Sequence, residues 1–272
     1  MVIIKRSPSR NHSRTEVLAE IIYKRKRNGF INFPVILGAG ASISSGASSM
    51  RNLVTSIAGK YNLRKFYAIL DQLDDSSRVA LLWEHLSTTT PSSGYGALVW
   101  LLKKGYFNLI FTTNHDTLLE NSLSKSGLLY GQDYAVTIMG RDTEDAIIES
   151  LSGIGPRIKI IKLHGCISIR KCAFTPVEIL EFQPKVENIM SEHLTHGAII
   201  VGHGMRDMDL DKCFTKKTGT VWYVGPKRPK VGEPISNILG SIRSNMILGY
   251  SGMFDNFFNN LRDQIAALES TI

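Results

Sequence analysis

The chain has 272 residues, of which 43% are hydrophobic and 21% charged, as is usual for a globular protein. It contains no run of about 18 apolar residues, and no long apolar stretch follows the basic residues at its start, so we expect neither a membrane span nor a secretory signal. Its three cysteines, Cys166, Cys172 and Cys213, form no Cys-x-x-Cys pair, which disfavours disulfides and a structural zinc site. The sequence therefore predicts a cytoplasmic protein with free thiols and no bound zinc.

The net charge of +8 is concentrated near the N-terminus. Residues 1–30 carry eight basic side chains (Lys5, Arg6, Arg10, Arg14, Lys24, Arg25, Lys26 and Arg27) against two acidic ones. A basic arm of this kind suits contact with nucleic acid or with an acidic partner surface. The other interpretation is a solvated helix face. The lack of aromatic residues spaced regularly among these charges disfavours nucleic acid.

The apolar pattern predicts strands and helices in alternation. A helix capped by Ser13 or Thr15 is expected to extend to about residue 28, and the apolar run Val35–Leu37 predicts a strand after it. Residues 50–105 show mostly helical spacing. Further strands are expected at 108–113, 158–163, 198–201, 221–224 and 246–248, and further helices at 116–125, 176–195, from about 207, and at 252–270.

These elements predict an α/β fold with a doubly wound parallel sheet, because apolar strands without clean alternation, separated by helices, are typical of a sheet covered on both faces. We expect one domain over residues 1–272. Its parts are a basic N-terminal helix at 1–30, a core at 31–250, helical insertions at about 52–90 and 166–195, and a C-terminal helix at 252–270. The apolar stripe of that last helix (Phe254, Phe257, Phe258, Leu261, Ile265 and Leu268) predicts core packing or a subunit interface.

Residues 33–46 form the glycine-rich stretch F-P-V-I-L-G-A-G-A-S-I-S-S-G. A strand, a glycine turn and the start of a helix together suit a pair of phosphates, since glycines let the backbone approach the ligand. The third glycine of the dinucleotide fingerprint is absent, because Ile43 stands there. An ordinary turn between strand and loop is the alternative interpretation.

Polar and small residues gather where four expected strands end. The four groups are Gly38–Ser45, Thr112–Asp116, His164–Gly165 and Gly202–Gly204. Ligands of doubly wound sheets bind outside the carboxyl ends of the strands, so these groups are the candidate functional residues.

In order and spacing, three of these segments resemble motifs of the sirtuin family. They are G-A-G-A-S at Gly38–Ser42, T-T-N-H-D at Thr112–Asp116 and K-L-H-G at Lys162–Gly165, and the resemblance extends over roughly residues 30–225. It implies a Rossmann-like sirtuin fold with helical insertions, and NAD as the ligand.

The sequence departs from the protein-deacylating sirtuins. Their four-cysteine zinc module is absent, Ala47–Arg51 replaces their Pro-Asp-Phe-Arg segment, and Thr113 replaces their Gln. The segments Thr112–Glu120 and Val201–Leu210 instead resemble a bacterial sirtuin-like branch of NAD-consuming antiphage effectors. That resemblance implies NAD hydrolysis rather than acyl transfer.

The resemblance also implies roles for individual residues. Asn114 would bond the ribose or the attacking water, and His164 has the pKa range of a general base. The NAD-binding set is Gly38, Ala39, Gly40, Ser42, Ser45, Thr113, Asp116, Gly202 and His203. The structural alternatives are a strand-end hydrogen bond for His164 and turn or cap roles for Asn114 and Asp116. The roles of His115 and His203 are left open.

The function expected from these observations is NAD+ glycohydrolysis, as the NAD-depleting effector of a bacterial antiphage, abortive-infection system. The alternatives are a non-catalytic module that binds NAD or ADP-ribose, and an NAD-dependent protein deacylase. Because 272 residues leave little room for a sensor domain, we expect control by a homo-oligomer, by a separate sensor or nucleic-acid-handling partner, or by both, and no membrane partner.

Overall fold

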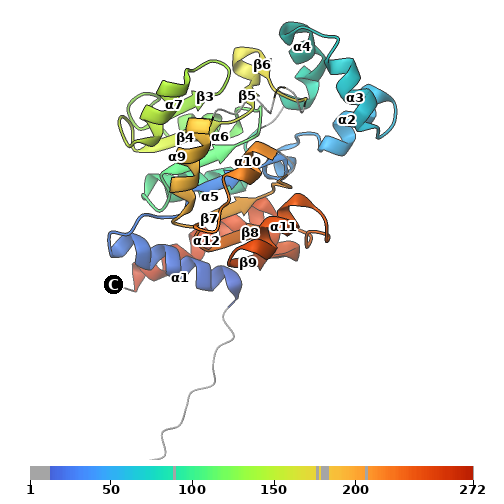
Figure 1. Cartoon of the computed structure of the whole chain (residues 1–272). Helices are drawn as coiled ribbons and strands as arrows, with labels where there is room; N and C mark the ends of the chain where they lie inside the picture. Colours follow the sequence, from blue (N-terminus) through green and yellow to red (C-terminus); the bar gives the residue numbers. More distant parts are fainter. Residues whose placement is uncertain (1–12, 88–89, 176–177, 179–183, 206–207, 272) are drawn as a thin grey trace, which may run out of the picture.

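The computed structural model describes residues 13–87, 90–175, 178, 184–205 and 208–271 (Figure 1). The first three basic residues of the predicted arm, Lys5, Arg6 and Arg10, lie outside this part of the chain. So do Arg206 and Asp207 of the segment that resembles the bacterial branch.

A seven-stranded parallel sheet forms the centre of the fold, with strand order β3-β4-β2-β1-β7-β8-β9. Its strands are β1 (Val35–Leu37), β2 (Leu109–Thr112), β3 (Tyr134–Ile138), β4 (Ile158–Lys162), β7 (Ala198–Val201), β8 (Val221–Val224) and β9 (Ser244–Ile247). Strand β1 lies in the middle, between β2 and β7, and the chain winds outward from it in both directions. The predicted doubly wound parallel sheet is confirmed.

Helices cover both faces of the sheet. One face packs against α1 (Arg14–Arg27), α5 (Ser93–Lys103), α6 (Leu118–Lys125) and α12 (Phe254–Ser270), and the other against α7 (Glu144–Leu151), α9 (Pro184–Leu194), α10 (Met208–Lys212) and α11 (Pro234–Ser241). Figure 1 shows α1 beside α12 at the bottom of the molecule, and these two helices are in contact. Burial of apolar side chains on both faces explains why the central strands are apolar throughout.

Three helices, α2 (Met50–Ala58), α3 (Leu63–Leu70) and α4 (Asp75–Leu86), occupy the first predicted insertion and project to the upper right of Figure 1. His85 of α4 bonds the hydroxyls of Ser48 and Ser56, at 2.9 and 3.0 Å. Arg78, buried in α4, pairs with the carboxylate of Glu178. These contacts therefore hold the insertion together and connect it to the segment after β4.

The second expected insertion is not helical at its start. Residues 165–172 form an antiparallel hairpin of β5 (Gly165–Cys166) and β6 (Lys171–Cys172), with the short 3-10 helix η3 (Ile167–Ile169) between its strands. Gly165 has a φ of 81°, and a Cβ at this position would collide with the backbone of Lys171. This turn directs the chain into a hairpin, and the helix α9 spans Pro184–Leu194 further along.

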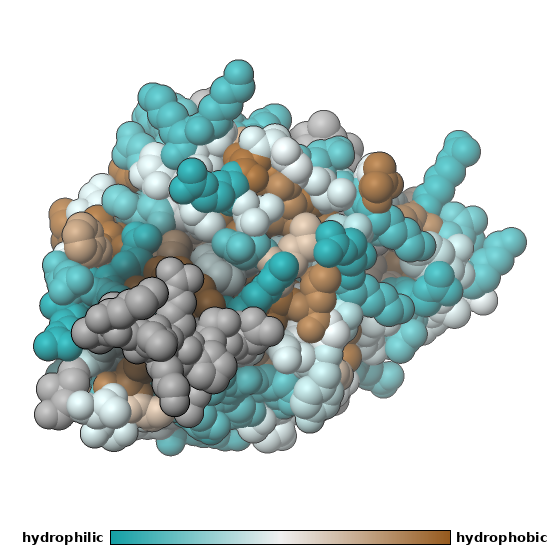
Figure 2. All heavy atoms as spheres, turned by 90° about the horizontal axis from the view of Figure 1, so that it is seen from below, coloured by the Kyte–Doolittle hydropathy of each residue, from teal (hydrophilic) through white to brown (hydrophobic). Residues whose placement is uncertain are grey.

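The apolar stripe at the C-terminus belongs to the core of this domain. Phe254, Phe257, Phe258, Leu261 and Ile265 are buried, and α12 packs against α5 and α1. No helix in the described ranges is both long and apolar enough to cross a membrane. The face seen from below is mostly hydrophilic, with apolar side chains in separate groups (Figure 2).

Asp255 of α12 holds the start of α5. Its carboxylate accepts hydrogen bonds from the hydroxyl of Ser92, at 2.6 Å, and from the backbone N–H of Gly94, at 3.1 Å. The first N–H groups of a helix have no partner within the helix, so a carboxylate from another helix can take the place of a capping side chain.

We predict that Asp255→Ala lowers the free energy of unfolding by about 1–2 kcal/mol, the usual effect of removing a helix cap. Urea denaturation measures this change. Asp263→Ala is the matched control, since that exposed carboxylate lies on the same helix and pairs only with its neighbour Arg262 among the described residues. Equal stability of the two variants would contradict the capping role.

Candidate functional site

The four predicted polar groups meet at the carboxyl edge of the sheet. Leu37 pairs with Thr112 and Val201, and Thr112 pairs with Lys162, so these residues form one row across four strands. Two residues further along each strand, the chain reaches Ala39, Asn114, His164 and His203. The predicted catalytic residues Asn114 and His164 therefore occupy equivalent positions after the adjacent strands β2 and β4.

The loops after β1 and β7 interlock through their glycines. A Cβ on Gly38 would lie 2.6 Å from Cα of His203, and one on Gly40 would lie 2.7 Å from Cα of Gly202. Gly202 has a φ of 64°, which favours glycine. The N–H of Gly40 donates to the carbonyl of Gly202, at 2.9 Å. Glycine is needed here for the close approach of two loops of the protein.

In the Gly38–Ser45 loop, which follows β1, most backbone N–H groups donate hydrogen bonds to carbonyls of the protein. That of Gly38 bonds the carbonyl of Val201, and those of Ala41 and Ser42 bond the carbonyls of Gly38 and Ala39. Within Gly38–Ser42, Ala39 is the exposed residue. The loop thus has a fixed shape, formed by the 3-10 helices η1 (Ala39–Ala41) and η2 (Ile43–Ser45), rather than an open row of N–H donors.

The hydroxyl of Ser42 joins three elements at the site. It donates to Oδ2 of Asp116, at 2.7 Å, and accepts from Nδ2 of Asn114, at 3.0 Å. Tyr95 Oη lies 3.2 Å away. Because a hydroxyl has one hydrogen and two acceptor positions, Tyr95 donates to Ser42, and all the bonding positions of Ser42 are then used. The side chain is buried, so this hydroxyl, which was predicted to bind phosphate, is engaged by other residues of the protein.

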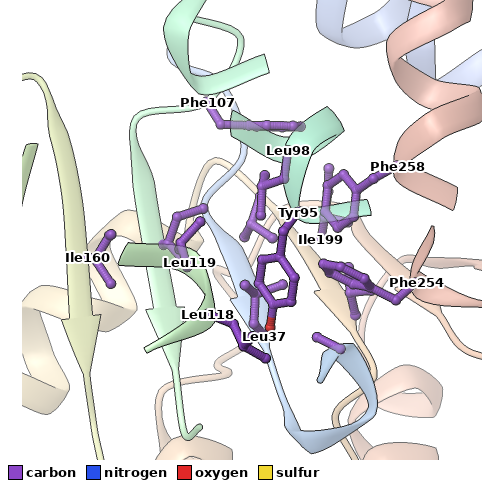
Figure 3. Close-up of a cluster of buried hydrophobic side chains, with 14 of the residues drawn as sticks. Leu37, Tyr95, Leu98, Phe107, Leu118, Leu119, Ile160, Ile199, Phe254 and Phe258 are labelled. Carbon is purple, nitrogen blue, oxygen red and sulfur yellow. The ribbon is translucent and has the colours of Figure 1, made fainter. Parts of the chain in front are cut away.

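Tyr95 enters the site from the core. Figure 3 shows its ring among buried apolar side chains that include Leu98, Phe254 and Phe258, with the hydroxyl at the end away from Leu98. Burial, followed by the charge of Asp116, holds the pKa of Tyr95 well above its ordinary value. The phenol therefore remains protonated and able to donate to Ser42.

These bonds fix the orientation of Asn114. Its amide N–H groups donate to Ser42 and to the carbonyl of Gly38, at 3.1 Å, and its backbone N–H donates to Thr112 Oγ1, at 3.1 Å. The amide oxygen is the part of the side chain that these bonds do not use. Asp116 is held in the same way, since Oδ1 accepts from the N–H of Leu118, at 3.0 Å. Asp116 thus stabilises a turn, which was the structural alternative to its predicted role in binding NAD.

A buried cation stabilises the loop after β2. Lys162, the last residue of β4, is 1% exposed, and its ammonium donates to the carbonyl of Asp116 and pairs with Glu120 Oε1, at 3.0 Å. Burial opposes the charged form, but the nearby charges, with Glu120 the largest of them, outweigh burial and leave the pKa of Lys162 above its ordinary value. A charged lysine therefore anchors the loop that carries Asn114.

His164 lies beside a cavity of about 270 Å³, which is lined also by Gly165, Ala173, Met139 and Asp142. The ring of His164 is buried, 6.3 Å between centroids from the ring of His115. Of the described residues, none of those in the Gly38–Ser45 loop is part of this lining. His164 thus lines a small cavity next to the β5–β6 hairpin and follows the strand adjacent to the one that leads to Asn114.

His115 and His203 both have structural contacts. His115 stacks on Phe174, with 4.1 Å between ring centroids, and its Nε2 bonds the carbonyl of Ala173, at 3.1 Å. His203 Nδ1 accepts from the N–H of Met205, at 2.8 Å, so the neutral ring carries its proton on Nε2, which lies 3.0 Å from Thr113 Oγ1. The ring thereby ties the loop after β7 to the loop after β2.

The side chain of Ser45 bonds the segment before α5. Its hydroxyl accepts a hydrogen bond from the N–H of Ser92, at 3.0 Å.

Tyr95, Lys162 and Glu120 are site residues that sequence reasoning missed. Lys162 and Glu120 stand within the resembling segments, and a lysine inside an apolar strand was the available signal.

The three cysteines are buried and unpaired with one another, and burial is the main factor that raises the pKa of the Cys172 thiol to about 12. In the described part of the chain, no three His, Cys, Asp or Glu residues are grouped as metal ligands. The zinc content of the protein stays a prediction.

We predict that Lys162→Met lowers the free energy of unfolding by about 3 kcal/mol, because it leaves Glu120 and a buried carbonyl without their cation. The double variant Lys162→Met/Glu120→Leu should recover part of this loss. Urea denaturation measures both, with the exposed Lys125→Met as control. A single variant as stable as that control would show that the pair does not hold the loop.

We predict that the purified protein carries well under one zinc per chain, since three buried cysteines without Cys-x-x-Cys spacing make a poor ligand set. Elemental analysis decides this. About one zinc per chain, lost together with thermal stability on chelation, would contradict the prediction.

A comparison with protein families matches part of the chain. Residues 108–218, less than half of the chain, match a family model described as a SIR2-like domain. This range contains Asn114, His164 and His203. No curated protein matches the sequence.

Solved structures match over nearly the whole chain. A Sir2 homologue in complex with NAD is 14% identical, with a TM-score of 0.55 and coverage of 94% of this chain and 95% of its own. A serine-to-alanine mutant of a Sir2 homologue with ADP-ribose is 15% identical, with a TM-score of 0.57 and coverage of 94% and 98%. A structure described as the structural basis for the mechanism and regulation of Sir2 enzymes is 15% identical, with a TM-score of 0.54 and coverage of 95% of this chain and 99% of its own. The chain therefore has the Rossmann-like fold of the sirtuins, and its residues 108–218 match the SIR2-like domain.

Proposed function

We propose that the chain is an NAD+ glycohydrolase that converts NAD+ and water into nicotinamide and ADP-ribose. The observation that carries this proposal is the pairing of Asn114 and His164 at equivalent positions of adjacent parallel strands, at the edge where the Gly38–Ser42 loop lies. An amide held by a hydrogen-bond network, with a histidine after the adjacent strand, suits chemistry at a ribose carbon. The structural similarity to Sir2 homologues in complex with NAD and with ADP-ribose supports the same ligand here.

The proposed reaction breaks the bond between the ribose and the nicotinamide nitrogen. The bonding electron pair leaves with the positively charged ring, which departs as neutral nicotinamide, and the ribose carbon gains oxocarbenium character. Water adds to that carbon and loses a proton to His164, directly or through a ribose hydroxyl. The amide oxygen of Asn114 orients the water or the ribose hydroxyl.

The binding roles follow the geometry of the edge. The exposed turn at Ala39, between Gly38 and Gly40, is proposed to receive the diphosphate, and Gly202 with His203 the adenosine ribose. Thr113 and Asp116 are proposed to face the nicotinamide. Ser42 contributes by holding Asn114 and Asp116, because its hydroxyl is already bonded to both. Ser45 would contribute through its bond to the start of α5.

One assay separates this function from its two alternatives. The purified chain is incubated with NAD+, with and without an acetylated peptide, and free nicotinamide, ADP-ribose and acetyl-ADP-ribose are measured. A glycohydrolase yields nicotinamide and ADP-ribose without the peptide. Products that depend on the peptide would identify a deacylase, and NAD+ binding without any cleavage would identify a non-catalytic module.

We predict that His164→Ala and Asn114→Ala each lower NAD+ cleavage by about 10²–10⁴-fold, the usual effect of removing a group that transfers or orients a proton. The initial rate of nicotinamide release measures this. Asn121→Ala, an exposed amide on α6, is the matched control and should retain full activity. Near-normal turnover by either site variant, with the fold intact by circular dichroism, would remove that residue from the mechanism.

We also propose that the enzyme is the NAD-depleting effector of a bacterial antiphage system, cytoplasmic, and controlled by assembly or by a separate partner. The segments Thr112–Glu120 and Val201–Leu210 support the effector role by their resemblance to that branch. The need for control follows from the reaction, since unrestrained NAD+ hydrolysis kills its host. The buried C-terminal stripe gives no surface for assembly, so the proposal rests on that need.

We predict that the specific activity rises with protein concentration or on addition of the activating partner, because assembly would order the helices α2–α4 next to the site. Light scattering and NAD+ cleavage are measured over the same concentration series. A strictly monomeric chain with constant specific activity, insensitive to any co-expressed partner, would contradict this proposal.

A further inference from the structure

A second cavity lies at the opposite edge of the sheet from the candidate site. Its volume is about 550 Å³, and it is bounded by residues before β1, at the start of β2 and β4, and at the ends of α7 and α9. This volume lies within the range of small-molecule sites. The proposed glycohydrolase reaction uses none of its residues.

The cavity contains a lysine on an otherwise apolar face of the sheet. Lys159 lies next to Leu109 in the strand register, on the face that packs against α7 and α9, and is 7% exposed. Its ammonium donates to the carbonyl of Ile154, and no described carboxylate forms an ion pair with it. Burial lowers the pKa of Lys159, against the charge of Glu149. A buried ammonium without an ion pair is costly, so an anion in the cavity would relieve this cost.

Two buried polar atoms in the lining have no hydrogen-bond partner among the described residues. They are Oδ1 of Asn32, a side chain that is 9% exposed, and Oγ of Ser150 at the end of α7. An unpaired buried acceptor costs about 1–3 kcal/mol. An N–H group on a ligand would satisfy Asn32, which an inorganic anion cannot do.

The rest of the lining combines polar side chains with apolar walls. Arg157 also lines the cavity, but its guanidinium donates to the carbonyls of Leu102 and Lys103 at the end of α5, and Glu192 is the acidic residue of the lining. His193 donates from Nε2 to the carbonyl of Leu151, at 3.1 Å, which directs the other ring nitrogen away from that bond. Pro34 and Ile189 supply apolar surface against which a flat ring can pack.

We propose that this cavity is a second binding site, and that it takes a nucleoside phosphate. The phosphate group would bind Lys159, the base would pack against the apolar walls, and an N–H group of the base would donate to Asn32. Three features of the cavity (a lysine without an ion pair and an acceptor without a hydrogen bond, both judged among the described residues, and apolar walls) match the three parts of such a ligand.

The test is the binding of AMP, ADP and inorganic phosphate to the full chain, measured by isothermal titration calorimetry. We expect AMP or ADP to bind more tightly than inorganic phosphate, and Lys159→Met to weaken this binding about tenfold or more, as loss of a charged hydrogen bond does. Lys60→Met, an exposed lysine on the other side of the sheet, is the matched control. Asn32→Leu should weaken AMP binding and leave phosphate binding unchanged.

The Asn114→Ala variant distinguishes the two edges of the sheet. Nucleotide binding that survives Asn114→Ala and is weakened by Lys159→Met supports the second site, whether or not the chain cleaves NAD+. Binding lost in Asn114→Ala and kept in Lys159→Met would place the nucleotide at the candidate site and overturn the proposal. Equal affinity for AMP and phosphate, or no binding at millimolar concentration, would also overturn it.

A measurement on the unmodified chain avoids any effect of the variants on folding. Photo-crosslinking with 8-azido-AMP, followed by peptide mapping, should label segments 150–159 or 189–196, and excess AMP should compete. Labelling confined to segments 38–45 or 112–116 would contradict the proposal.

Discussion

The site depends on a single buried hydroxyl, that of Ser42. It joins the loop after β1 to Asn114 and Asp116 after β2 and to Tyr95 of α5, and it uses every bonding position that a hydroxyl has. Because each partner would lose a buried hydrogen bond if it moved, the three elements hold one another in place. The orientation of the candidate catalytic amide is therefore set by the protein alone, which is the preorganisation that catalysis at a ribose carbon requires.

Strand β4 shows how the fold supports both edges of its sheet. Lys162, at the carboxyl end, lies on the α6 side and pairs with Glu120, while Lys159, at the amino end, lies on the α7 and α9 side. Alternation of side chains along a strand places residues three apart on opposite faces. A strand that reads as apolar thus places one ammonium beneath the candidate site and another beside the second cavity.

Much of the fold and the location of the site could be predicted, because both depend on short-range patterns. The apolar runs at β1, β7 and β8 determine the sheet, and a polar residue just after such a run marks its carboxyl edge. The edge strand β3, the helices α7 and α11 and the β5–β6 hairpin were missed, because they are short and take their stability from packing and from the turn at Gly165. Tyr95 was missed for a different reason: its helical spacing assigns it to the core, and only the three-dimensional arrangement brings its hydroxyl to Ser42.

The two edges of the sheet differ in how their polar atoms are satisfied. At the carboxyl edge the side chains of Ser42 and Asp116 form hydrogen bonds within the protein, so the surface offered to the proposed substrate is rigid. The affinity of that substrate would come from its fit to this surface and from the few polar atoms not used in these bonds, such as the amide oxygen of Asn114. At the amino edge Asn32 and Ser150 retain buried atoms that have no hydrogen-bond partner in the part of the chain that the structure describes. A protein tolerates that cost where a ligand repays it, so the first arrangement suits an oriented reaction and the second suits binding without chemistry.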